Sequence, residues 1–248
     1  MKSKKIVPKY NKFSFPKIGL IALASDYIIE RDFQNILKNK KIDLFVNRIE
    51  SFNPLTRNNL IKMSKKITKV TNNILPGEKV DCVAYACTSG TIAAGYAIIK
   101  NKVIKAKPNS KITTPSTSSI NALRKFKIKK IAIFTPYSKK LNDEVLDYFK
   151  INNFIITSNS YFNIKSDINI GKVDSRHLYR VLSNMKLNGA EALFISCTAL
   201  PALSIIEKLE KKLGIMVFSS NQVLIWDTLN KIGIKNNIKG FGKLMRSN

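Results

Sequence analysis

The sequence predicts an α/β protein with two similar lobes, each a doubly wound parallel sheet of the Rossmann or flavodoxin type, related by pseudo-two-fold symmetry. Three observations support this prediction. Short apolar runs alternate with helix-length segments, the pattern restarts near the middle of the chain, and an apolar run ends in Cys-Thr twice, at Cys87 and at Cys197. Because such sheets bind ligands at the carboxyl ends of their strands, we expect the active site in the cleft between the lobes.

The first half of the chain reads as three strands separated by helices. The predicted strands are short apolar runs bounded by turn residues, at 17–25, 43–47 and 80–87. The predicted helices repeat apolar residues at helical spacing, at 29–38, 56–73 and 91–100. Residues 76–79, PGEK, form a turn. The Ser-, Thr- and Pro-rich segment 107–119 reads as a loop whose last hydroxyl residues can cap a helix starting at Ile120.

The second half repeats this alternation and adds a final strand and helix. Its predicted strands are at 129–135, 154–160, 191–196 and 215–220. Its predicted helices are at 139–150, 175–187, 202–213 and 221–231. The two strands that end in Cys-Thr hold equivalent places in the two halves. We therefore assign residues 1–113 and 219–248 to a lobe that carries Cys87, and residues 114–218 to a second lobe that carries Cys197.

The composition is that of a soluble globular protein with an excess of lysine. Of the 248 residues, 44% are hydrophobic and 24% charged, and the formal net charge is +27. Such a charge can serve nucleic-acid binding, but only 7 of the 43 basic residues are Arg, and the lysines are spread along the whole chain. We therefore expect no nucleic-acid partner. The charge is interpreted as a general bias that would steer an acidic substrate.

Neither a signal peptide nor a membrane-spanning segment is predicted. The basic start of the chain lacks the apolar core of a signal peptide. No apolar run reaches the roughly 18 to 20 residues that a membrane-spanning helix needs. We expect a cytoplasmic protein without a membrane partner, and we expect it to form a homo-oligomer.

The three cysteines, Cys82, Cys87 and Cys197, are too few for a disulfide framework, and none belongs to a CxxC pair. A zinc site needs three or four ligands, and the single histidine, His177, lies far from every cysteine in the sequence, so no metal is expected. A Cys-His catalytic pair is disfavoured because His177 falls on a predicted surface helix. Cys82 lies inside its strand and is interpreted as a packing residue.

The repeated Cys-Thr pair indicates a site built from two halves. A thiol at the start of a helix lies close to free backbone N–H groups, so we expect its pKa to be lowered. The same N–H groups and the neighbouring hydroxyls can hold a carboxylate. Two such units facing each other would place one sulfur on either side of a carbon atom of a small carboxylate. One sulfur could attack or remove a proton while the other donates a proton, and no cofactor is required.

Several motifs resemble the aspartate/glutamate racemase superfamily. The resemblance is to the branch that holds maleate cis-trans isomerase, arylmalonate decarboxylase and the ectoine-utilisation isomerase-like protein. It is strongest to the last of these, through LASDYIIERDF and SCTALPAL. The motifs that carry it span nearly the whole chain: IGLIALASDYIIERDF, VAYACTSGTIAAG, IFTPYSKKLNDEV, ALFISCTALPAL and FSSNQVLIWDTL.

The resemblance implies a role for each cysteine. Cys87 matches the cysteine that attacks the substrate double bond in maleate isomerases, and Cys197 matches the one that donates a proton. The residues that the resemblance assigns to substrate binding carry hydroxyl, phenol or amide groups: Thr88, Ser89, Tyr137, Thr198 and Asn221.

Two positions depart from relatives in this branch. Asp26 stands where maleate isomerases carry an Asn, and an ionised Asp can only accept hydrogen bonds. Asp26 would therefore repel a dicarboxylate or pair with a nitrogen-bearing substrate, unless it only caps the helix that follows. A second family Asn falls near Asp167, without a firm alignment. Cys87 stands where arylmalonate decarboxylases carry glycine, which favours two-cysteine isomerase or racemase chemistry.

The sequence thus predicts a cofactor-independent isomerase or racemase of a small carboxylate, which the resemblance places in ectoine degradation. Two alternatives remain open. One is a decarboxylase of the arylmalonate decarboxylase type, and the other is a non-catalytic protein that binds a small carboxylate.

Overall fold

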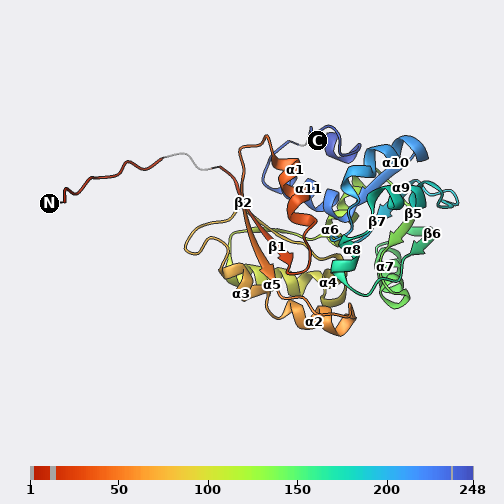
Figure 1. Cartoon of the computed structure of the whole chain (residues 1–248), viewed down its shortest axis with the longest axis horizontal. Coiled ribbons are helices and arrows are strands. Elements are labelled where there is room, and N and C mark those ends of the chain that lie inside the picture. The colour runs from red at the N-terminus through yellow and green to blue at the C-terminus, as the bar shows by residue number, and fades with distance from the viewer. Residues whose placement is uncertain (1–2, 12–14, 236, 248) are drawn as a thin grey trace.

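The computed structural model describes residues 3–11, 15–235 and 237–247, and it contains two four-stranded parallel sheets side by side (Figure 1). The first sheet has the order β2-β1-β3-β4 and the second the order β6-β5-β7-β8. The strands of the first sheet are β1 (Lys17–Leu23), β2 (Asp43–Ile49), β3 (Cys82–Tyr85) and β4 (Lys111–Thr113). The strands of the second sheet are β5 (Lys130–Thr135), β6 (Ile155–Tyr161), β7 (Ala192–Ile195) and β8 (Met216–Ser219). Both halves therefore place their strands in the same order, which confirms the predicted fold class.

The inner strands are buried on both faces, as parallel sheets covered by helices require. All residues of β3 and β7 are buried, and β1 and β5 are exposed only at their first residue. Their sequences are accordingly almost continuous apolar runs. The edge strands β2 and β6 are less buried and carry more polar residues than β1, β3, β5 and β7.

The helices of the first half differ from the prediction at three places, the first of which is the predicted helix 56–73, interrupted by a turn at residues 65–66. The helices are α1 (Ile29–Leu37), α2 (Arg57–Ser64), α3 (Ile67–Asn72), α4 (Thr88–Ala94), α5 (Tyr96–Ala106) and α6 (Pro115–Lys125). The predicted helix 91–100 is split at Gly95, whose φ of +87° is readily adopted by glycine. The predicted loop 107–119 contains β4 and the start of α6, because Thr114 caps that helix through the N–H of Thr117 and Pro115 takes its first position.

The second half is completed by α7 (Lys139–Ile151), α8 (Asp167–Gly171), α9 (Ser175–Ser183), α10 (Ile206–Leu213) and α11 (Ser220–Lys231), with 3-10 turns at Leu203–Ile205 and Leu244–Arg246. The helix α8 was not predicted. The helix α11 is buried along nearly its whole length and contacts β3 and β4 of one sheet as well as β8 of the other. It thus belongs to the core that the two halves share. Among the helices that the structure describes, none is both long and apolar enough to cross a membrane.

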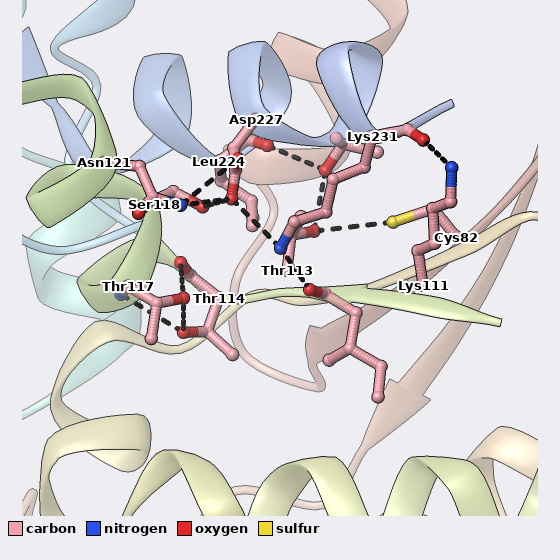
Figure 2. A network of polar contacts seen from close by, with 12 residues as sticks. Cys82, Lys111, Thr113, Thr114, Thr117, Ser118, Asn121, Leu224, Asp227 and Lys231 are labelled. Carbon is pink, nitrogen blue, oxygen red and sulfur yellow. Dashed lines mark hydrogen bonds and ion pairs between the residues drawn. The ribbon is translucent and has the colours of Figure 1, made fainter. Parts of the chain in front are cut away.

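A buried network of hydrogen bonds and an ion pair connects α11 to α6 and β4 (Figure 2). Its centre is Asp227 on α11, which accepts a hydrogen bond from the hydroxyl of Ser118 at 2.8 Å and pairs with Lys231 at 3.4 Å. The ammonium of Lys231 also donates to the carbonyl of Ile112 on β4 at 2.7 Å. This network therefore crosses the predicted boundary between the lobes at residues 113 and 114, and that boundary stays a prediction.

Replacing Asp227 with alanine should destabilise this junction. The residue is 5% exposed, so the variant would leave a buried hydroxyl and a partly buried ammonium without their acceptor. We expect Asp227→Ala to lower the free energy of unfolding by about 3 kcal/mol, measured by urea denaturation. The control is Asp147→Ala, which removes an exposed pair with Lys150 and should change stability by less than about 1 kcal/mol. Equal losses in both variants would contradict the central role of this network.

Candidate active site

The carboxyl ends of five strands meet at one buried cluster. Two or three residues after the ends of β1, β3, β5, β7 and β8 lie Asp26, Cys87, Tyr137, Cys197 and Asn221, respectively. All five are between 1% and 5% exposed. The cluster therefore lies where parallel sheets bind ligands, in a closed arrangement.

Cys87 occupies the N-cap of α4. Its Sγ atom accepts a hydrogen bond from the N–H of Gly90 at 3.2 Å and lies 4.0 Å from the hydroxyl of Ser89. A Cβ atom at position 90 would come within 2.7 Å of this sulfur and 2.9 Å of the Tyr85 hydroxyl. Glycine at position 90 is thus what allows the sulfur and the phenol to approach the first turn of α4.

Cys197 has a backbone conformation that only a few non-glycine residues adopt, with φ at +91°. Its N–H donates to the hydroxyl of Ser220 at 3.0 Å, which helps to hold this conformation. Such strained residues cost about 1 to 3 kcal/mol each and concentrate at functional sites. The strain at Cys197 therefore supports a functional role for this residue.

Tyr137 connects the two cysteines. Its hydroxyl lies within interaction range of Cys197 and Ser89, and the hydroxyl of Ser89 in turn approaches Cys87. Burial, and then the proximity of Cys197 and Cys87, raises the pKa of the Tyr137 phenol well above its usual value. Tyr137 is therefore a neutral hydrogen-bond donor at any physiological pH.

Hydroxyl groups also join the halves of the cluster directly. The hydroxyl of Thr88 donates to Ser220 at 2.9 Å, and that of Thr198 donates to the carbonyl of Ala86 at 3.2 Å. Both protons are thus used within the protein. Of the predicted carboxylate-binding hydroxyls, those of Ser89 and Tyr137, which contact the sulfurs, are better placed to meet a ligand.

Three buried carboxyl groups belong to the same cluster. Asp26 accepts hydrogen bonds from the N–H groups of Ile28 and Ile29 at 2.8 and 3.1 Å, just before α1, although the N-cap position itself is held by Ile28. Asp167, on α8, accepts from the hydroxyl of Ser25 at 3.2 Å. The third is Asp32 on α1. The Asn221 side chain donates to it at 2.7 Å and to the carbonyl of Thr198 at 2.9 Å.

The thiol pKa values move in the opposite direction from that expected at a helix start. Burial, with a smaller contribution from the charge of Asp167, raises the pKa of Cys87 to about 12. Burial also raises the pKa of Cys197 well above its usual value, again with a contribution from Asp167. The N–H of Gly90 does lower the pKa of Cys87, but burial outweighs it. The expectation of a lowered pKa is therefore wrong for this closed arrangement.

The cluster brings together all of the residues that the sequence singled out: Asp26, Cys87, Thr88, Ser89, Tyr137, Cys197, Thr198 and Asn221. Their roles in binding and catalysis stay predictions. Cys82 lies at the opposite end of β3, beside Thr113, and His177 is exposed on α9, stacked on Phe162.

Three further residues of the cluster were not predicted. Ser220 directly follows β8, so the rule applied to the other strand ends could have found it. Asp32 interrupts the apolar stripe of α1, between Ile28 and Ile36, and an acid at such a position signals a buried partner. Tyr85 gives no such signal, because tyrosine is common in strands.

The family model that matches this chain is arylmalonate decarboxylase (Amdase), over residues 61–245. A maleate isomerase from Geobacillus stearothermophilus is 22% identical over 243 residues, which cover 92% of this chain and 96% of the relative. These matches extend across both sheets and both cysteine positions.

Two solved structures have the same fold. A cysteine-to-alanine variant of maleate isomerase Iso from Pseudomonas putida S16, with maleate, aligns with a TM-score of 0.87 at 19% identity, covering 94% of this chain and 98% of the other. A cysteine-to-serine mutant of Nocardia farcinica maleate cis-trans isomerase, with a covalently bound succinylcysteine intermediate, also gives 0.87, at 17% identity and 94% and 99% coverage.

Proposed function

This chain belongs to the arylmalonate decarboxylase family, and from that premise we propose that it is a cofactor-independent isomerase or racemase that acts on a small carboxylate. The observation that carries this proposal is the pair of buried cysteines at equivalent strand ends, linked through Tyr137 and Ser89. Relatives named maleate isomerase, and the succinylcysteine intermediate in one of them, support a maleate-isomerase-like reaction.

In the proposed reaction the two sulfurs act on opposite faces of the substrate. If the substrate has a double bond, the Cys87 thiolate forms a bond to one of its carbons, and Cys197 gives its proton to the other. Rotation about the resulting single bond follows. Cys197 then takes the proton back as the bond to Cys87 breaks, which yields the trans isomer. If the substrate has an acidic α-proton, Cys87 removes it and Cys197 donates one from the other face.

The surrounding residues would hold the substrate and the sulfurs. We assign Ser89 and Tyr137 to the substrate carboxylate, on the basis of their contacts with the sulfurs. Thr88, Thr198 and the amide nitrogen of Asn221 would position the two strand ends, because their hydrogen bonds are made to the protein. We further propose a place in ectoine degradation, two lobes divided as the sequence predicts, and a cytoplasmic homo-oligomer.

Proton NMR in D2O tests this function. Maleate, aspartate, glutamate and an arylmalonate would each be incubated with the wild type and with Cys197→Ser. Deuterium at an α-carbon, or a new isomer that forms only with the wild type, is the expected result. Loss of CO2 from the arylmalonate would instead favour the decarboxylase alternative. No reaction with any compound by a folded protein would favour the non-catalytic binding protein.

A further inference from the structure

The cysteine cluster is acidic, although the protein as a whole is strongly basic. Asp26, Asp32 and Asp167 are 1%, 5% and 4% exposed; the first two lie at or just before α1, and Asp167 comes from the distant helix α8. Buried carboxylates are ordinarily paired with a cation. Burial raises the pKa of Asp26, and the charge of Arg48 partly opposes this rise. The guanidinium group, however, donates to the backbone carbonyls of Leu23 and Asp26 and pairs with Glu30, so it makes no hydrogen bond to the Asp26 carboxyl group.

Besides the Tyr85 hydroxyl, two buried acceptor atoms in this cluster receive no hydrogen bond from any residue that the structure describes. They are the Oδ2 atom of Asp26 and the Oδ1 atom of Asn221. Thr198 lies beside Asp26, but its hydroxyl proton is donated to the carbonyl of Ala86. Both unpartnered atoms therefore belong to side chains that adjoin Thr198, next to Cys197. The Oδ1 atom of Asn221 needs a donor, and so does the Oδ2 atom of Asp26 when that carboxyl group is ionised; a dicarboxylate dianion supplies none.

The charge of the cluster points the same way. Burial, and then the charge of Asp26, raises the pKa of Asp167 to about 6, so this carboxyl group is mostly ionised at neutral pH. Asp167 and Asp26 both raise the pKa of the two cysteine thiols. Burial also raises the pKa of Asp26 above its usual value, so a cation beside it would favour its ionised form, whereas a dianionic substrate would favour its protonated form.

We propose that the substrate carries a cationic amino group besides its carboxylate, and that Asp26 and Asp167 bind this group while Ser89 and Tyr137 hold the carboxylate. An ammonium group offers three donors and one positive charge, which suit the unpartnered atoms of Asp26 and Asn221 and the charge of Asp167. Its arrival would also favour thiolate formation beside the bound substrate. This inference rests on the proposed function only in placing the substrate between the two cysteines.

Titration calorimetry with matched ligands tests the inference. Each amino compound is compared with the compound that lacks the nitrogen: aspartate with succinate, β-alanine with propionate, and 2,4-diaminobutyrate with butyrate. In at least one pair the amino compound should bind about tenfold more tightly or better, as expected for a charge-assisted hydrogen bond. N-acetylaspartate, which keeps an N–H but loses the charge, should bind less tightly than aspartate if aspartate is the compound preferred.

Asp26→Asn and Asp167→Asn should each remove this preference, and Asp147→Asn on the exposed face of α7 should keep it. Asparagine keeps a side-chain oxygen that can accept from the N–H groups of Ile28 and Ile29, so Asp26→Asn is expected to fold. The inference is wrong if succinate or maleate binds more tightly than every amino compound, or if no amino compound binds. Isomerisation of maleate with no preference for amino compounds would support the proposed function and contradict this inference. Binding of an amino compound without turnover of any compound would support this inference and contradict the proposed function.

Discussion

Cys87→Ser and Cys197→Ser are each expected to lower turnover by about 10²- to 10⁴-fold, the range typical of a positioned acid, base or nucleophile. Serine has nearly the same size, so the buried cluster should stay packed. Its hydroxyl is a far poorer nucleophile and acid than a thiol at this position. The measurement is the initial rate with whichever compound the NMR panel identifies, together with circular dichroism and the thermal midpoint to verify folding.

Cys82→Ser is the matched control, because Cys82 is equally buried but lies at the other end of β3, beside Thr113. It should keep nearly full turnover. The double variant Cys87→Ser/Cys197→Ser should be little slower than either single variant, since groups that act as a unit are not additive. Wild-type turnover in both single variants would rule out the two-sulfur mechanism.

The location of the site could be predicted because one rule covers most of it. In a parallel α/β sheet the residues that follow the strands meet at one edge, so recognising β3 and β7 was enough to bring Cys87 and Cys197 together. The same rule places Tyr137 and Asn221. The strand β4 is not predicted from the sequence because it has only three residues, KIT, within a segment that otherwise reads as a loop.

The electrostatics of the site could not be predicted in the same way. The position of Cys87 at the start of α4 suggests a lowered thiol pKa, and the N–H of Gly90 does act in that direction. The larger effect is burial, which depends on how both halves close over the sulfur. The proximity of Asp167 adds to it, and α8, which carries that residue, gave no strong periodic signal in its five residues.

Asp32→Asn is expected to stabilise the protein at neutral and alkaline pH. Burial raises the pKa of Asp32 from 3.8 to about 7, and the charge of Asp26 adds to this, while the hydrogen bond from Asn221 opposes it. The folded state therefore binds more protons than the unfolded state between these pH values. Stability contributed by this group is full near pH 4 and falls as the pH rises to about 7. An uncharged Asn would avoid this loss, which is up to about 4 kcal/mol at pH 8.

The measurement is urea unfolding of the wild type and Asp32→Asn at pH 5, 6, 7 and 8. The variant should gain stability relative to the wild type as the pH rises, and the comparison at each pH cancels the effect of the high surface charge. Asp147→Asn, at an exposed position, should show no such trend. A difference that stays constant from pH 5 to pH 8 would mean that Asp32 ionises with an ordinary pKa. If the stability difference does rise with pH, a cationic ligand that offsets the negative charge of this cluster should stabilise the wild type more strongly at pH 8 than at pH 5. The pH dependence of stability and the preference for a cationic ligand would then have the same cause, the buried carboxylates of the site.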